Sequence, residues 1–363
     1  MILYLLQYVQ IAQINVTNHN HIVKNAGGIR AMKIMDCTLR DGANVLGNGF
    51  PEDLTVLILN GLTENGVSVI EYGNAKGLGA ETLGFEGPVS DARYFELAQP
   101  YLDKAEVGMF LNAKRYKKEN VEHAAKAGLA FLRVGADAGD AEKYTEVIRT
   151  VKDNGLKCRY SLMKAYLLNP EELAEEALKL QNMGVDEVTI MDSAGCMLPD
   201  EVKEYVKALK NKVSIPVGFH CHNNLGMSAA NAQAAMESGV DLLDCGLLGM
   251  ARSAGNLATE VAAALAHKVG EAKEVNFYGL LNYLEKELIP AMEKHGYEPD
   301  ITPLELILGY SGCHSSFVKK FKAVAAEYGV DVKELIVEVS KIDRKSPSEE
   351  LMKKIAETLK EAK

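Results

Sequence analysis

The stretch "NMGVDEVTIMDSAG", residues 182–195, contains the unit from which most of the chain is built. A glycine ends an amphipathic helix, a short apolar run follows, and a polar turn closes the unit. Glycine just past a helix end adopts the left-handed conformation that other residues avoid, and an apolar run bounded by turn signals is typical of a buried strand. The same order recurs in "ENGVSVIEYGN", "KAGLAFLRVGAD", "DNGLKCRYSLM" and "ESGVDLLDCGLLG", with stops at Gly66, Gly128, Gly155, Gly184 and Gly239.

The spacing of these glycines indicates a repeated strand–helix unit. Two gaps are 27 and 29 residues, and the gaps of 62 and 55 are close to doubles, with "AEVGMFLNA" and "IPVGFHCHN" supplying the missing strands. Eight such units predict a (β/α)8 TIM barrel. The alternative, an open doubly wound sheet, lacks a glycine-rich dinucleotide turn after the first strand. The predicted strands cover residues 33–37, 67–72, 105–111, 129–135, 156–162, 185–191, 215–221 and 240–246.

The pattern divides the chain into three parts. We expect residues 1–31 to be an extension that precedes the native start, because Met32 or Met35 would be a natural first residue at the first strand. Residues 32–272 are predicted to form the barrel. Residues 273–363 contain helical periodicity without intervening strands, which predicts a helical C-terminal domain.

Composition excludes several classes of function. The chain has 363 residues, 25% of them charged, and a formal net charge of −10, so neither a nucleic-acid partner nor a membrane surface is expected. Its six cysteines form no CxxC pair and no apolar run is long enough to span a bilayer. These features predict a cytoplasmic protein with reduced thiols.

A metal site is indicated by "GFHCHNNLG", residues 218–226. His220 and His222 would project to the same face of a strand. An isolated pair of this kind is more often satisfied by hydrogen bonds. Here, however, "MDCTLRDGANV" ends the first strand and places Arg40 and Asp41 at the same rim of the barrel, where active sites of this fold lie. Asp41, His220 and His222 would then form a two-histidine, one-carboxylate set for a divalent metal that also binds substrate.

Three motifs at the ends of the first, seventh and eighth strands make the chain resemble the metal-dependent lyase and aldolase barrels. They are "DCTLRDG", "HCHNNLG" and "AGNLATE". That group includes hydroxymethylglutaryl-CoA lyase and isopropylmalate synthase. Within it the chain most resembles the 4-hydroxy-2-oxovalerate aldolase family, through "IEYGNAKGLGAETLGFEG", "MDSAGCMLPDEV" and the tail segment "LGYSGCHSSFVKKFKAVAAEYG".

The resemblance implies a class II aldolase that cleaves a 4-hydroxy-2-oxo acid to pyruvate and an aldehyde by a retro-aldol step. Arg40 would stabilise the pyruvate enolate beside the metal, for which Mn²⁺ is expected, with Mg²⁺, Co²⁺ and Zn²⁺ as alternatives. Asn256 is either a ligand of the metal or a structural loop residue. Glu71 either orients Arg40 or is an ordinary carboxylate of the rim. Expected partners are a small 2-oxo acid substrate, and an aldehyde dehydrogenase or further copies of the chain.

The chain departs from the aldolase pattern at the catalytic base. Asn44 stands where the aldolases carry a histidine, and asparagine cannot exchange a proton near neutral pH. In the tail, Tyr310 remains and His314 replaces a second tyrosine, so His314 either supplies the base or merely fills the space of tyrosine. Two alternatives to the aldolase stay open: an acyl-CoA lyase or synthase of the same barrel group, and a metal-binding barrel with altered catalysis.

Overall fold

The computed structural model describes residues 31–297, 303–311, 313, 317–343 and 347–361. The chain separates into two compact units, Met1–Ala31 and Met32–Lys363. The predicted N-terminal extension lies outside the described residues except for Ala31. The account below concerns the second unit.

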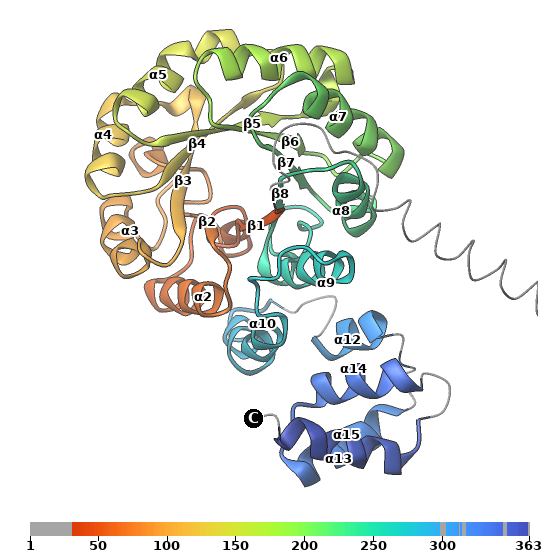
Figure 1. Cartoon of the computed structure of the whole chain (residues 1–363). Helices are drawn as coiled ribbons and strands as arrows, with labels where there is room; N and C mark the ends of the chain where they lie inside the picture. Colours follow the sequence, from red (N-terminus) through yellow and green to blue (C-terminus); the bar gives the residue numbers. More distant parts are fainter. Residues whose placement is uncertain (1–30, 298–302, 312, 314–316, 344–346, 362–363) are drawn as a thin grey trace, which may run out of the picture. The chain divides into compact units, whose positions relative to one another are not determined.

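Eight parallel strands close into a barrel, because β1 pairs with both β2 and β8. The predicted TIM barrel is therefore confirmed, and its strands begin and end within about three residues of the predicted bounds. Figure 1 shows the strands at the centre of a ring of helices. The strands are β1 Lys33–Asp36, β2 Val69–Tyr72, β3 Glu106–Asn112, β4 Phe131–Asp137, β5 Lys157–Met163, β6 Glu187–Asp192, β7 Val217–Cys221 and β8 Leu242–Cys245.

Five helices of the ring end just before the glycines found in the sequence. The five glycine stops all have φ between 78° and 94°. At Gly66 a Cβ atom would also lie 2.0 Å from the carbonyl oxygen of Glu274, so only glycine fits. Helix α6 begins with a capping box in which Asn169 and Glu172 exchange hydrogen bonds. The ring contains α2 Glu52–Glu64, α3 Asp91–Ala98, α4 Lys118–Lys126, α5 Thr145–Asp153, α6 Pro170–Asn182, α7 Pro199–Lys212, α8 Ser228–Glu237 and α9 Thr259–Val269.

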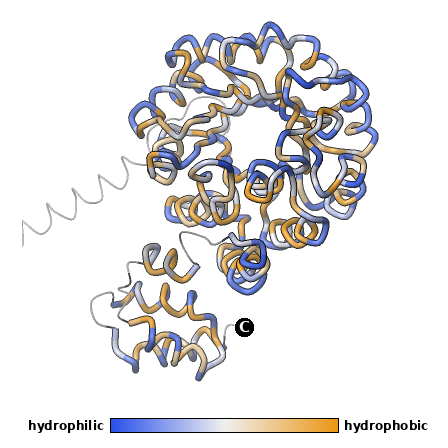
Figure 2. Tube along the Cα trace, turned by 180° about the vertical axis from the view of Figure 1, so that it is seen from behind, coloured by the Kyte–Doolittle hydropathy of each residue, from blue (hydrophilic) through white to orange (hydrophobic). Residues whose placement is uncertain are grey.

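Two apolar clusters hold the barrel together. The larger one joins the outward side chains of the strands to the inner faces of the helices. In Figure 2 hydrophilic and hydrophobic stretches alternate along these helices, as expected for helices with one face in the core. The smaller cluster comes from inward positions of the strands, at Met35, Cys37, Val69, Phe131 and Leu242. The remaining inward positions include buried charged residues, which is unusual for a structural core.

The chain continues as helices after the barrel, as predicted. They are α10 Phe277–Tyr283, α11 Ile289–Glu293, α12 Pro303–Ser311, α13 Val318–Tyr328, α14 Val332–Ile342 and α15 Glu349–Glu361, and a π-helical turn at Leu284–Leu288 joins α10 to α11. Within the described part of the chain, no helix combines the length and apolar character needed to cross a membrane.

Candidate metal centre and active site

The turn after β1 is fixed by its own backbone. The carbonyl oxygen of Cys37 accepts hydrogen bonds from the backbone N–H groups of Arg40 at 3.0 Å, Asp41 at 2.8 Å and Gly42 at 3.2 Å. A Cβ atom on Gly42 would lie 3.2 Å from the carbonyl oxygen of Met250, so the loop after β8 packs closely against this turn. The glycine of the "RDG" motif therefore allows the close approach, and the two preceding side chains project from a rigid support.

The two histidines come from the end of β7. His220 lies in the strand, and His222 follows it directly and forms an antiparallel bridge with Asn256 of the loop after β8. Their ring centroids are 5.2 Å apart. The alternate spacing thus brings both imidazoles to the same side of the chain.

Asp41, His220 and His222 converge on one point. Oδ2 of Asp41 lies 3.7 Å from Nε2 of His220 and 3.7 Å from Nε2 of His222, and all three side chains are buried. One donor atom from each residue lies within 4.8 Å of the other two. A single divalent ion can therefore contact all three donors.

Each histidine has an oxygen atom close to its other ring nitrogen. Nδ1 of His220 lies 3.3 Å from Oδ2 of Asp244, and Nδ1 of His222 lies 3.3 Å from the carbonyl oxygen of Gly255. An acceptor at Nδ1 favours the tautomer that leaves Nε2 unprotonated, which is the form that binds a metal.

Several buried polar atoms around this point have no hydrogen-bond partner among the described residues. They include Nε2 of His220, Nη2 of Arg40 and Oδ1 of Asn256. An unpaired buried polar atom typically costs about 1–3 kcal/mol. Their convergence indicates a site built for a charged ligand, and two imidazoles with one carboxylate are suited to a divalent cation.

Asn256 belongs to the edge of this site. Its Nδ2 donates to Oδ2 of Asp41 at 3.1 Å. It also lines a cavity of about 370 Å³ between the loops after β7 and β8, together with Leu248, Glu260 and Tyr297.

Arg40 is held from three sides. Its Nη1 lies 3.0 Å from Oδ1 of Asp41, its Nε donates to Glu71, and its guanidinium carbon lies 4.9 Å from the ring centroid of Phe110. Glu71 occupies an inward position of β2 and contacts Arg40. Orientation of Arg40 by Glu71 would depend on this contact. The planar guanidinium is fixed next to the candidate metal ligands.

A second arginine extends this contact across the barrel interior. Arg133 of β4 donates to Glu71 of β2 and to Asp244 of β8, and Asp244 in turn approaches His220. The contacts return through Asp41 to Arg40. We call this closed set of six buried residues the charge ring; it consists of Arg40, Glu71, Arg133, Asp244, His220 and Asp41.

The ring determines the charges at the site. Burial raises the pKa of Asp41, but Arg40 and the two histidines outweigh burial and hold that pKa below its usual value. The pKa values of Glu71 and Asp244 are likewise lowered, because Arg133 outweighs the effect of burial. Burial, reinforced by His220, lowers the pKa of His222 to about 4. Near neutral pH His222 is therefore neutral, as a metal ligand must be.

Cys37, His220 and Asp244 form a second group of potential ligands, which shares one histidine with the first. Burial raises the pKa of the Cys37 thiol well above its usual value, and Nη2 of Arg133 lies 3.4 Å from its Sγ. Asp244 is already paired with Arg133. The group built on Asp41 is therefore the better metal site.

The structure does not bring Tyr310 to this cluster. Tyr310 packs against Phe277, with ring centroids 5.2 Å apart, and its carbonyl oxygen accepts from Nζ of Lys268 at 2.6 Å. Lys268 is in the last turn of α9. The first turn of that helix is the one near the carboxyl end of β1, because Thr259 there donates to Asp36. Tyr310 therefore contacts the other end of α9. His314 lies outside the described residues.

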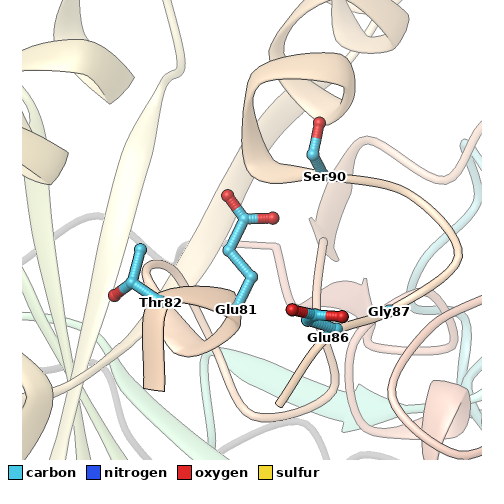
Figure 3. Close-up of a pocket in the computed structure, with 5 residues that line it drawn as sticks. All are labelled: Glu81, Thr82, Glu86, Gly87 and Ser90. Atoms are coloured by element: carbon cyan, nitrogen blue, oxygen red, sulfur yellow. The ribbon is translucent and has the colours of Figure 1, made fainter. Parts of the chain in front are cut away.

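Another hollow, shown in Figure 3, lies on the segment after β2. Its lining includes the carboxylates of Glu81 and Glu86 and the hydroxyl of Ser90, but none of the residues of the charge ring. It does not contribute to the candidate site.

The amino-acid sequence matches two family models. The model described as HMGL-like covers residues 31–286, and the DmpG-like communication domain covers residues 299–361. The chain belongs to the HMGL-like family. Among the HMGL-like relatives, 4-hydroxy-2-oxovalerate aldolase 2 of Nocardia farcinica is 34% identical over 86% of this chain and 90% of its own length. The 4-hydroxy-2-oxovalerate aldolase of Geobacillus genomosp. 3 is 31% identical over 92% of this chain and 98% of its own.

Solved structures of other proteins share the fold. Hydroxymethylglutaryl-CoA lyase from Pseudomonas aeruginosa superposes with a TM-score of 0.62, covering 77% of this chain and 98% of its own at 18% identity. The N-terminal domain of a putative aldolase from Bacteroides vulgatus gives a TM-score of 0.60 at 23% identity, covering 74% of this chain and 90% of its own. The resemblance to aldolase-type carbon–carbon lyases is confirmed by the family and the named relatives.

Three residues at the site are not found by reading the sequence: Arg133, Asp244 and Lys76, whose Nζ donates to Oδ1 of Asn44 at 2.6 Å. A signal existed for the first two, because each interrupts an apolar strand, in "FLRVGAD" and "LLDCGLLG". A charged residue at an inward strand position needs a partner across the barrel. Lys76 lies in a loop, and no local pattern distinguishes it from a solvated lysine.

Proposed function

We propose that this chain is a class II aldolase that cleaves a 4-hydroxy-2-oxo acid to pyruvate and an aldehyde. The observation that carries the proposal is the meeting of Arg40 with Asp41, His220 and His222 at one buried point. Breaking the C3–C4 bond of such a substrate leaves negative charge on the oxygen at C2. Fixed positive charge beside that oxygen is what the reaction requires.

We assign the divalent metal to Asp41, His220 and His222, with Asn256 at its edge. Mn²⁺ is the proposed ion. When bound, the ion supplies Lewis-acid polarisation of the substrate oxygens. The lowered pKa of His222 and the oxygen atoms close to both Nδ1 atoms support this assignment.

Arg40 places its guanidinium where the enolate charge develops. Glu71 and Phe110 hold it in one orientation, so little reorganisation is needed when the charge appears. Arg133 fixes Glu71 from the opposite side and keeps the carboxylate paired. Glu71 is therefore a positioning residue in this proposal.

An acyl-CoA lyase of the same barrel group is less well supported. Those lyases resemble this chain in their motifs but use a cysteine in the loop after the eighth strand. The nearest thiol here, Cys245, is buried at the end of β8, and burial raises its pKa well above its usual value. A thiol in that state is a poor acid–base group.

Pyruvate release tests the function directly. The purified chain, loaded with Mn²⁺, should release pyruvate from at least one member of a panel of 4-hydroxy-2-oxo acids, and chelation of the metal should stop the reaction. The replacement His222→Ala should lose the metal, measured by elemental analysis, while far-ultraviolet circular dichroism stays unchanged.

The exposed His123 of α4 offers a matched control. The replacement His123→Ala should keep both metal and activity. Full metal content in His222→Ala would count against the site, and metal-independent pyruvate release by the parent would count against the class II mechanism.

We further propose a cytoplasmic location and an aldehyde dehydrogenase as partner. The match of residues 299–361 to a communication domain supports the partner, because the aldehyde product is reactive and suits direct transfer. Co-elution of the two proteins on gel filtration is the expected result, and separate elution at micromolar concentration would argue against the pairing.

A further inference from the structure

Asn44, which stands where the resembling aldolases carry a histidine, contacts the side-chain amine of Lys76. Oδ1 of Asn44 accepts a hydrogen bond from Nζ of Lys76 at 2.6 Å. Nδ2 of the same amide donates to the carbonyl oxygen of Asp41 at 2.9 Å. One amide side chain thus lies between the lysine and the backbone of a proposed metal ligand.

The segment that carries Lys76 is tied down on both sides. The backbone N–H of Lys76 donates to Oδ1 of Asn74 at 2.8 Å, and the carbonyl oxygen of Lys76 accepts from Nη1 of Arg115 at 2.8 Å. The next residue but one, Leu78, donates its N–H to the carbonyl oxygen of Phe110 at 2.8 Å, next to the ring that supports Arg40. The ammonium is therefore held at the rim by a rigid loop.

Charged groups on three other elements surround Lys76. Arg40 and Asp41 belong to the turn after β1, Arg115 to the segment after β3, and Arg252 to the loop after β8. Burial and then Arg252 lower the pKa of Lys76, while Asp41 opposes them. A larger fraction of this amine is unprotonated near neutral pH than in an ordinary lysine.

We propose that Lys76 accepts the proton of the substrate 4-hydroxyl, in the role that a histidine fills in related aldolases. The inference rests on the aldolase function proposed above. Its support is the fixed contact with Asn44, one side chain from the proposed metal ligand, and the rigid loop. The competing role for the same contacts is an anchor for the substrate carboxylate, which would need the charge but not the proton exchange.

The step balances without a further reactant. The neutral amine takes the proton from the 4-hydroxyl, and the C4–O bond becomes a carbonyl as the C3–C4 bond breaks. The electron pair of that bond forms the C2–C3 double bond of the pyruvate enolate. The ammonium then releases its proton to solvent, and the enolate takes one from water at C3.

Kinetics of two replacements test the role. The replacement Lys76→Ala should lower kcat for aldol cleavage by about 10²- to 10⁴-fold, the usual worth of a general base. The replacement Lys76→Arg should be similarly impaired, because a guanidinium keeps the charge but stays protonated. Added ethylamine should partly restore Lys76→Ala, in proportion to the concentration of its neutral form.

Two controls separate this role from a structural one. Lys104, an exposed lysine just before β3, offers the matched replacement Lys104→Ala, which should behave as the parent. Decarboxylation of oxaloacetate gives the same enolate without removing a hydroxyl proton. Lys76→Ala should therefore keep this activity and its metal content, and it should lose the rise of kcat/KM with pH that the parent shows in aldol cleavage.

Each contrary outcome has its own meaning. If the parent cleaves no 4-hydroxy-2-oxo acid, the proposed function fails. If the parent is active and Lys76→Ala equals it, only the assignment of Lys76 fails. Full activity in Lys76→Arg would show that Lys76 binds the substrate carboxylate and does not accept the proton. Loss of cleavage in His314→Ala but not in Lys76→Ala would identify His314 as the base.

Discussion

Arg40 shows how much of the site depends on single contacts. Its guanidinium has a carboxylate on each side and a ring beneath it, yet Nη2 has no partner among the described residues. Nη2 is thus the donor left for a ligand. Because the side chain is buried, its geometry is set before substrate arrives, which is the condition for strong stabilisation of a transition state.

We expect Arg40→Ala to lower kcat for pyruvate release by about 10²- to 10³-fold with a smaller change in KM. The parallel replacement Arg40→Lys keeps the positive charge but lacks the planar guanidinium with its several N–H donors, and it should retain part of the rate. Arg93, exposed and paired with Glu52 and Glu96, provides the control replacement Arg93→Ala. Steady-state kinetics at saturating Mn²⁺ measure the effect, and an unchanged kcat in Arg40→Ala would exclude the assigned role.

The sequence reveals those site residues whose positions are set by local rules. His220 and His222 share a face because of strand periodicity, and Asp41 and Arg40 follow a strand end. Arg133 and Asp244 are different, because they are 111 residues apart and meet only through the register of a closed barrel. Lys76 depends on the path of a loop, which no periodic pattern encodes. Its contact with Asn44 becomes visible only in three dimensions.

Among the elements, strands and ring helices follow the sequence closely, while the connections do not. The glycine stops fix where five of the ring helices end: α2, α4, α5, α6 and α8. The helical segment that begins at Phe277 is interrupted by a π-helical turn at Leu284–Leu288. Pro290 follows at the start of α11 and has no N–H to donate to the preceding turn, so the hydrogen-bond pattern shifts there.

Helix α9 begins with a carboxyl group whose ionisation is costly. Oε2 of Glu260 accepts from the N–H of Leu248 at 3.1 Å, and burial raises its pKa to about 7. The folded chain therefore keeps a proton that the unfolded chain loses above pH about 4.5. The contribution of Glu260 to the free energy of unfolding falls as pH rises from about 4.5 to 7. Above that range the full cost of ionising the buried carboxyl group is present.

We expect Glu260→Gln to stabilise the fold at pH 8 by about 1–3 kcal/mol, because glutamine still accepts the hydrogen bond without a charge. The gain should shrink towards pH 5, where the folded parent is already protonated. Urea denaturation at both pH values measures the difference. Glu274, an exposed residue after α9, supplies the control Glu274→Gln. A gain in Glu260→Gln that is equal at both pH values would refute the argument.

At the scale of the whole molecule, closure of the barrel determines what the interior can contain. The pairing of β1 with β8 leaves no free sheet edge among the eight strands. It also brings inward residues from β2, β4, β7 and β8 into mutual contact. A polar interior of this kind is stable only when every charge has a partner, so the charge ring and the closed barrel depend on each other.

The charge ring holds two arginines against three carboxylates, so with a neutral histidine it has a net charge of −1. A divalent cation changes this to +1, and the monoanion of a 2-oxo acid then brings the buried site to electrical neutrality. The empty ring repels an anion, whereas the ring with a cation attracts one. We therefore expect ordered binding, with the metal first and the acid second.

Calorimetry can measure this order. Pyruvate should bind detectably in the presence of Mn²⁺ and not after chelation, and pyruvate should tighten Mn²⁺ binding by the same factor by which Mn²⁺ tightens pyruvate binding. Equal affinity for pyruvate with and without the ion would contradict the ordered scheme. The one uncompensated negative charge of the charge ring would therefore select a cation first and an anion second.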